Sequence, residues 1–141
     1  MAAIDDVLSE LRDEFDLLGD WEERYRYVIE MGKDLDPLTD AERSDANKVR
    51  GCASQVWLVT EPQAEGTLRF RGDSDAHIVS GLIAILLRLY SGHPAREILD
   101  FDVKAAIDSL GLSGALSAQR SNGLASMVAR IRRDAEFMLA A

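Results

Sequence analysis

The chain is poor in side chains that bind metals or form crosslinks: its 141 residues include one cysteine, Cys52, and two histidines, His77 and His93. A structural zinc site needs about four Cys or His ligands, and an iron–sulfur cluster usually takes four cysteines. A single copy of the chain therefore cannot hold either centre. One cysteine also excludes an internal disulfide, so the thiol of Cys52 either acts alone or is structural.

Basic residues are also scarce. Lys and Arg number 16 against 25 Asp and Glu, which gives a formal net charge of −9, and no basic cluster is longer than Arg132-Arg133. Such a surface repels the phosphates of nucleic acids and the headgroups of anionic lipids. We therefore expect neither nucleic acid nor a membrane among the partners.

No stretch has the pattern of a targeting or membrane-spanning segment. The first 15 residues are acidic and amphipathic, and they lack the basic start and apolar centre of a signal peptide. The longest apolar run, 78–90, is too short to span a bilayer and carries Arg88. We expect this run to be a buried core helix in a soluble, cytoplasmic protein.

Apolar residues make up 47% of the chain and charged residues 29%, which is a globular composition. We find no internal repeat or low-complexity linker, so we expect one domain over 1–141. Helical spacing of apolar residues predicts helices at 4–18, 21–31, 75–90 and 121–140, with shorter ones at 94–99 and 102–110. The second of these helices is expected to end near Gly32, and Asp73 or Ser74 to cap the helix at 75–90.

Strand-forming residues are concentrated between these helices. The segments SQVWLVTE (54–61) and GTLRFRG (66–72) have strand composition, and a short connection joins them. Residues 49–51 predict a third, earlier strand. Neighbouring strands with short loops must be antiparallel. The predicted class is α+β: a small antiparallel sheet of about three strands covered by helices from both ends of the chain.

Cys52 lies in the stretch NKVRGCASQVWLV, between the short predicted strand at 49–51 and the longer one at 54–61. Gly51 permits unusual backbone angles, and Ala53 and Ser54 leave space beside the sulfur. Lys48 and Arg50 are close enough in sequence to lower the thiol pKa. This composition fits a reactive thiol on a loop. The alternative stays open, because free cysteines often serve as small buried hydrophobes.

Three separated motifs resemble one family. VRGCASQVWLV (49–59) resembles the V-x-G-C-x-S-x-V-W pattern of SufE proteins, and RGDSDAHIVSGLIAIL (71–86) resembles their G-D-S-D-A-x-I-V-x-G-L-x-A segment. LGLSGALSAQRSNGLASMVARI (110–131) resembles the family's late L-x-x-x-R-x-x-G-L-x-x-M-x-x-x-I segment. The motifs follow one another in the family's order, so the resemblance covers more than half of the chain.

The resemblance implies a sulfur carrier. SufE-like proteins accept sulfur as a cysteine persulfide from a PLP-dependent cysteine desulfurase of the SufS or CsdA type and stimulate that enzyme. They then deliver the sulfur for iron–sulfur cluster assembly on a SufBCD-like scaffold complex. Cys52 falls on the family's acceptor cysteine. No cofactor or metal of its own is implied, because PLP belongs to the partner.

The family fold resembles the IscU scaffold, although this chain lacks the three cysteines that such a scaffold uses. The chain is expected to act as a monomer or homodimer.

The resemblance also assigns roles to other residues. Arg120 falls on the family's late arginine. This predicts a guanidinium near the loop that carries Cys52 (the cysteine loop, residues 51–55), where it stabilises a persulfide anion or contacts the desulfurase. A solvated arginine at a helix start is the alternative. Asp73 and Asp75 could suggest a metal site, but helix capping is the better interpretation of their position. Because the loop 73–75, with Ser74, lies near the acceptor cysteine in the family, Asp75 is expected to influence docking or the opening of the cysteine loop.

Two other classes of function remain. A thiol-dependent hydrolase or one-Cys peroxidase needs a base or proton-handling group beside the sulfur, for which His77 and His93 are the only imidazoles. A non-catalytic interaction domain would carry Cys52 as an inert side chain.

Overall fold

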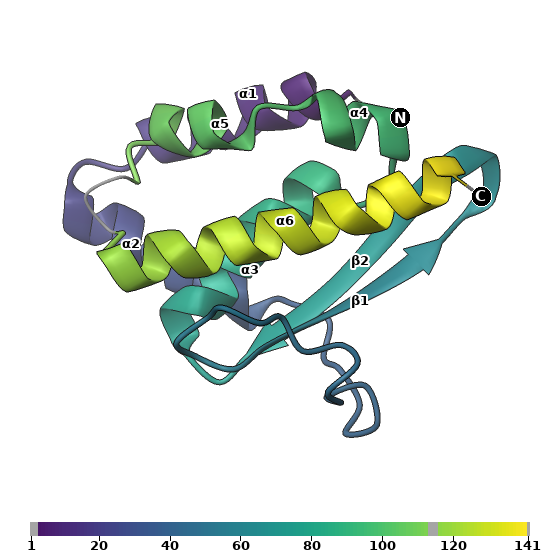
Figure 1. Cartoon of the computed structure of the whole chain (residues 1–141). Helices are drawn as coiled ribbons and strands as arrows, with labels where there is room; N and C mark the ends of the chain where they lie inside the picture. Colours follow the sequence, from purple (N-terminus) through teal and green to yellow (C-terminus); the bar gives the residue numbers. More distant parts are fainter. Residues whose placement is uncertain (1–2, 113–115, 141) are drawn as a thin grey trace.

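The computed structural model describes residues 3–112 and 116–140. In chain order its elements are α1 (Ile4–Asp16), α2 (Trp21–Lys33), β1 (Val56–Pro62), the 3-10 turn η1 (Ala64–Gly66), β2 (Thr67–Ser74), α3 (His77–Tyr90), β3 (His93–Pro94), α4 (Ala95–Asp100), α5 (Val103–Ser109) and α6 (Ala118–Ala140). Figure 1 shows the helices gathered against a narrow sheet, from which a long loop between α2 and β1 projects. The expected α+β class is confirmed.

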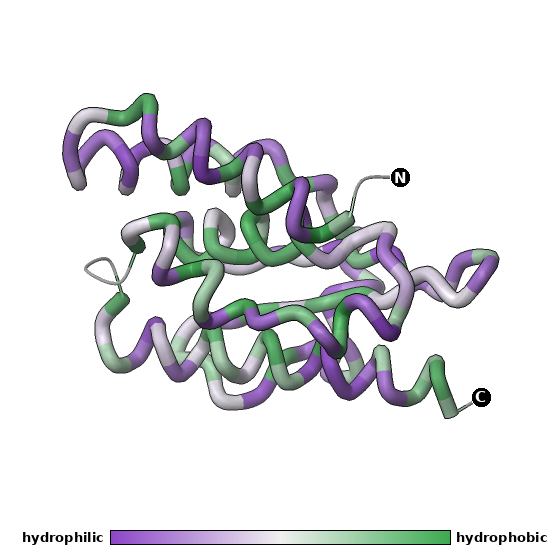
Figure 2. Tube along the Cα trace, turned by 90° about the horizontal axis from the view of Figure 1, so that it is seen from above, coloured by the Kyte–Doolittle hydropathy of each residue, from purple (hydrophilic) through white to green (hydrophobic). Residues whose placement is uncertain are grey.

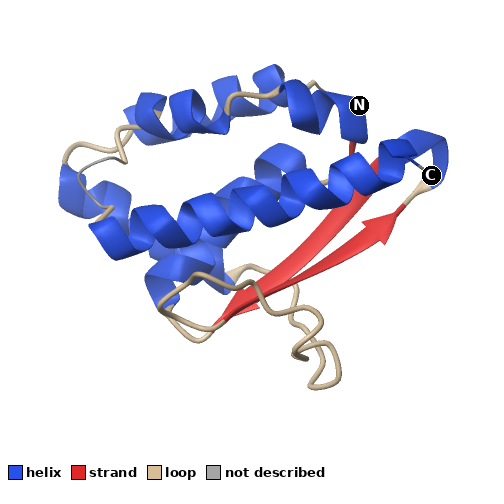
Figure 3. Ribbon diagram, in the orientation of Figure 1, coloured by secondary structure: helices blue, strands red, loops and turns tan. Residues whose placement is uncertain are grey.

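The sheet is antiparallel with the strand order β1-β2-β3. Its long hairpin pairs Val56 with Ser74 at one end and Pro62 with Leu68 at the other, and β3 pairs with β2 where Leu68 faces His93. Strands and helices are separated by colour in Figure 3. The expected number of strands is right, but the third strand is β3 instead of the segment 49–51.

The segment before Cys52 makes only an isolated bridge, between Lys48 and Trp57. Its backbone donates from Val49 N to Val56 O at 2.8 Å and accepts at Asn47 O from Leu58 N at 2.9 Å. Pairing stops there because Gly51 takes a positive φ of 91° and turns the chain out of the strand direction. This turn leaves Cys52 on a loop beside the edge of β1.

Helix α3 forms the centre of the fold. It is apolar nearly all round, as expected, and it packs against α2 and β2. Figure 2 shows the hydrophobic residues concentrated between the layers. Helix α2 ends at Lys33, next to Gly32 as expected. A Cβ at Gly32 would collide with the backbone of Gly81, so this glycine also permits a close approach of the two helices.

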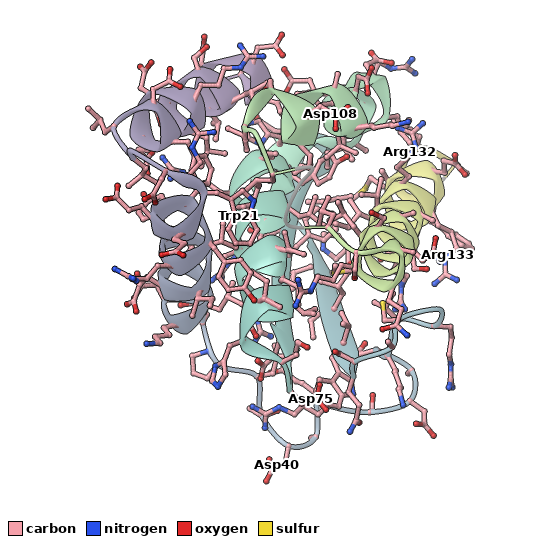
Figure 4. The ribbon with its side chains drawn as sticks, turned by 90° about the vertical axis from the view of Figure 1, so that its left-hand side faces the viewer. Trp21, Asp40, Asp75, Asp108, Arg132 and Arg133 are labelled. Atoms are coloured by element: carbon pink, nitrogen blue, oxygen red, sulfur yellow. The ribbon has the colours of Figure 1, made fainter. Side chains whose placement is uncertain are left out.

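Helix α6 crosses the molecule beside α3 and the hairpin (Figures 1 and 4). It begins three residues before the expected start, and its first turn is capped where the Ser117 hydroxyl accepts from Arg120 N at 3.2 Å. Its buried face comprises Gly123, Met127, Ile131 and Ala135. Among the apolar side chains of α6, those of Met127 and Ile131 are buried, whereas those of Leu124, Val128 and Met138 are only half-buried.

The start of α3 corrects another expectation. Its N-cap position is Ala76, and no side chain caps the helix. Asp73 and Ser74 belong to β2, because the strand continues through the segment expected to cap the helix. The Asp73 carboxylate pairs instead with Arg43 at 2.9 Å, and the Ser74 hydroxyl accepts from Ala76 N at 3.2 Å.

Candidate functional site

The thiol of Cys52 points toward helix α6. The residue is half-buried, and its Sγ lies 3.6 Å from the carbonyl oxygen of Gly123, to which the thiol donates. Gly123 has no side chain to fill the space beside the sulfur: a Cβ built there would come within 3.6 Å of Sγ. A glycine inside a helix lowers the stability of that helix. At position 123 it leaves room for the Cys52 side chain to pack against α6.

Gly51 allows the cysteine loop to pack closely against the same helix. A Cβ at Gly51 would come 2.5 Å from the hydroxyl oxygen of Ser126, and its φ of 91° is one that other residues rarely adopt. The loop is also held from the α6 side by Arg130, which donates to the carbonyl of Ala46 at 3.1 Å and to that of Lys48 at 3.5 Å. The conformation around Cys52 is therefore set by contacts with α6.

A cavity of about 230 Å³ opens beside the sulfur. Its walls come from the cysteine loop, the start of α3 and the first turns of α6. The lining residues are Cys52, Ala53, Ser54, Ala76, Ile78, Val79, Leu82, Ser117, Gln119, Arg120, Gly123, Leu124 and Met127. The cavity brings Cys52, Ala53, Ser54 and Arg120 together, and both polar and apolar side chains line it.

Burial raises the pKa of the Cys52 thiol above its ordinary value of 9.0. The expectation that Lys48 and Arg50 lower this pKa is wrong in this conformation, because desolvation dominates and the Arg50 side chain is exposed. The hydrogen bond to Gly123 also requires the protonated thiol, since only an S–H can donate. The site thus holds a neutral thiol, which is the form that does not attack electrophiles.

Asp75 bonds to the far end of the cysteine loop. Its carboxylate accepts from Gln55 N at 3.0 Å, and its own backbone N donates to Gln55 O at 3.3 Å. Figure 4 shows Asp75 just before α3. These two bonds tie the loop to the start of α3, three residues after Cys52.

The other acidic candidate lies apart from the sulfur. Asp73 faces Arg43 of the loop 34–55 and is not among the residues that line the cavity. Within residues 3–112 and 116–140, no three His, Cys, Asp or Glu side chains gather in a way that could hold a metal ion. Asp73 and Asp75 thus bind protein groups in this structure.

Neither histidine is among the residues that line the cavity of Cys52. His77 is exposed and does not line the cavity. His93 pairs with Leu68, at the opposite end of β2 from Ser74, which pairs with Val56 near the cysteine loop. Six residues of strand separate the two ends, roughly 20 Å. A thiol hydrolase needs a base beside the sulfur, and in this conformation neither imidazole lines the cavity.

Three residues at the site carried no separate assignment in the sequence: Gly123, Ser126 and Gln55. Gly123 lies inside the third motif, and an isolated glycine in a helical pattern is a recognised sign of close approach. Ser126 and Gln55 have no such sign, because their roles depend on which loop backbone faces them.

Among the described residues, no helix has both the length and the apolar character needed to cross a bilayer.

The fold and the site define a class: a small α+β domain that keeps a single thiol protonated in a cavity between a loop and two helices. Comparison with known proteins identifies the family. Residues 9–135 match the family model described as SufE, Fe-S metabolism associated domain. The chain belongs to the SufE family.

Two relatives agree with this assignment, and a solved structure shares the fold. The chain is 52% identical to an uncharacterized SufE-like protein of Rhizobium etli, over all of this chain and 95% of that one. It is 49% identical to an uncharacterized SufE-like protein of Rhizobium meliloti, over 95% and 98% of the two chains. The solution structure of a hypothetical protein from Thermus thermophilus has the same fold, with a TM-score of 0.76 and 19% identity over 96% of this chain and 97% of that one.

Proposed function

We propose that this protein accepts sulfur on Cys52 from the persulfide of a cysteine desulfurase. The Cys52 thiolate attacks the terminal sulfur of the donor persulfide, a new S–S bond forms on Cys52, and the donor cysteine leaves as a thiolate that takes up a proton. The products are a Cys52 persulfide and the donor thiol. The exchange needs no metal and no oxidant, which suits a site built around one thiol.

The observation that carries the proposal is the cavity beside Cys52. Its volume of about 230 Å³ is several times the roughly 30 Å³ that a water molecule occupies in the liquid, so a further sulfur atom fits beside Sγ. Gly123 contributes to this space because it lacks a side chain. A persulfide held there is shielded from oxidants and from competing thiols, which would otherwise remove its sulfur.

The closed conformation also implies that the loop opens. Cys52 is half-buried, its pKa is raised, and its proton is engaged by Gly123. A donor active site can reach the sulfur only after the cysteine loop moves away from Gly123 and the thiol ionises in a more polar environment beside Arg120. The small residues Gly51, Ala53 and Ser54 give the loop the backbone freedom for this exchange.

The partners that we propose are those that membership of the SufE family implies. The donor is a SufS- or CsdA-like desulfurase that carries the PLP, and removal of its product sulfur raises its turnover. Delivery goes to a SufBCD-like scaffold that builds iron–sulfur clusters, in the cytoplasm. Arg120, on the cavity wall, supplies the positive charge that stabilises a persulfide anion on Cys52.

The test is the intact mass of the protein after incubation with a cysteine desulfurase, PLP and L-cysteine. We expect the native chain to gain one sulfur atom, about 32 Da, and the Cys52→Ser variant to gain none. Desulfurase turnover should rise with the native chain and stay at its basal level with the variant. No mass gain together with unchanged turnover would overturn the proposal and favour an inert cysteine.

A hydrolase or one-Cys peroxidase makes a different prediction. Either activity would appear with an activated ester or a peroxide in the absence of desulfurase, and it would vanish in a His77→Gln, His93→Gln double variant. Sulfur acceptance does not depend on imidazole, so the same double variant should still gain sulfur if it folds.

A further inference from the structure

An aromatic pair on α2 lies against Arg120 of α6. Tyr25 stacks on Trp21, with ring centroids 5.1 Å apart and planes inclined by 27°. Arg120 Cζ lies 6.0 Å from the centroid of the Tyr25 ring. Since Arg120 also lines the cavity of Cys52, the aromatic pair reaches from the exposed Trp21 ring, on the first turn of α2 (Figure 4), to the wall of the sulfur site.

Local contacts set both ends of this arrangement. Asp20 caps α2 by accepting from Glu23 N at 2.9 Å, and Glu23 accepts in turn from Gly19 N at 2.7 Å. The start of α2 is thereby set, and Trp21 and Tyr25, four residues apart, share one face. On the other helix, the Ser117 cap sets the first turn of α6, from which Arg120 projects.

The physical interaction is between a cation and the face of an aromatic ring. The ring face is negative, and a guanidinium within about 6 Å of the centroid is attracted to it. Arg has several rotatable bonds, so a fixed surface for its planar head reduces the range of positions that it explores. Tyr25 is half-buried, and its own ring is steadied by the stacked Trp21.

We propose that Tyr25 is a positioning residue that holds the Arg120 guanidinium at the wall of the Cys52 cavity, where it stabilises the sulfur anion that forms on Cys52. The inference deepens the proposed function and rests on it for the identity of the natural reaction. Tyr25 is one of the contacts of Arg120, so its loss weakens the stabilisation without abolishing it.

The experiment measures the rate at which iodoacetamide alkylates Cys52 over a series of pH values. Only the thiolate reacts, so the rate reports the reactive anion without a desulfurase. Tyr25→Leu should slow alkylation about two- to fivefold and move the pH midpoint upward. Tyr25→Phe, which keeps the ring face, should match the native rate. Arg120→Gln should slow alkylation at least as much as Tyr25→Leu.

The double variant decides whether Tyr25 acts through Arg120. In the Arg120→Gln background, Tyr25→Leu should cause no further slowing, because the guanidinium that it positions is gone. Equal slowing in both backgrounds, or a native rate in Tyr25→Leu, would overturn the inference. A readout that needs no variant is the Arg120 Nε–H resonance of the native chain: the ring should shift it upfield, and its normal position would also count against the contact.

Failure of this inference and failure of the proposed function have different signatures. Alkylation uses neither desulfurase nor persulfide, whereas the mass gain requires both. If Cys52 gains sulfur and the variants show no coupling, the role of Tyr25 is wrong and the proposed function stands. If coupling is present and no sulfur is gained, Tyr25 positions Arg120 at a thiol whose reaction is of another kind.

Discussion

The thiol of Cys52 donates to the carbonyl oxygen of Gly123 across 3.6 Å, between a loop and a helix that are 71 residues apart in sequence. The carbonyl can accept this bond in addition to its helical N–H because it has two lone pairs. The missing side chain of Gly123 gives the sulfur its place against the helix. The same glycine therefore receives the protonated thiol and leaves room beside it.

Substitution of Gly123 should separate these two effects. The Cβ of Gly123→Ala would lie 3.6 Å from Sγ, an ordinary contact, and alanine favours the helix by about 0.5–1 kcal/mol. We expect Gly123→Ala to be as stable as the native chain or more so, with the thiol still protected from alkylation. Gly123→Val adds methyl groups where the sulfur lies and should expel Cys52, so that alkylation becomes faster. Equal alkylation rates in the two variants would contradict this packing.

Asp75 should control how often the cysteine loop opens. Its carboxylate accepts from Gln55 N at 3.0 Å, and the loss of one such bond changes an opening equilibrium by about 1 kcal/mol, or roughly fivefold. We expect Asp75→Ala to accelerate both amide exchange at residues 51–55 and alkylation of Cys52 by about that factor. Asp75→Asn keeps an oxygen that accepts, and it serves as the matched control. Unchanged exchange in Asp75→Ala would show that the backbone bonds alone hold the loop.

The fold was predictable where one local signal decides each element. The helical spacing in α1, α3 and α5 and the strand composition of the hairpin all placed their elements within a few residues. β3 was missed because two residues, His93 and Pro94, carry no strand pattern, and their pairing with β2 is set by the position of α3. The caps expected at Asp73 and Ser74 were wrong for a related reason, since strand pairing with β1 extends through both residues.

In the candidate site, too, some features were predictable from the sequence and others were not. Cys52, Ala53, Ser54 and Arg120, all of which lie in the sequence motifs, line one cavity. The state of the thiol was not predictable, because nearby basic residues favour a low pKa while burial against α6 raises it. Which of the two dominates depends on the contact with Gly123, a residue far away in sequence.

Gly51 should be required for the loop to close on α6. A side chain there meets both a φ of 91° and the Ser126 hydroxyl, and a strained backbone position costs about 1–3 kcal/mol. We expect Gly51→Ala to lower the free energy of unfolding in urea by an amount in that range and to expose Cys52 to alkylation. Gly66→Ala is the matched control: its φ of 72° is similarly unusual, but a Cβ there has open space. That variant should lose stability with no change in alkylation, and equal alkylation in the two variants would count against the role of Gly51.

The raised pKa of Cys52 makes closure of the loop sensitive to alkaline pH. Burial raises the thiol pKa above 9.0, so the open or unfolded chain releases its proton at a lower pH than the closed one. The stabilisation from the buried thiol is therefore complete below a pH of 9.0. It is lost as the pH rises through the higher pKa that the thiol has in the folded chain. We expect the difference in free energy of unfolding between the native chain and Cys52→Ala to be constant below that point and to fall above it. A difference that stays constant or grows with pH would mean that burial does not hold the thiol neutral.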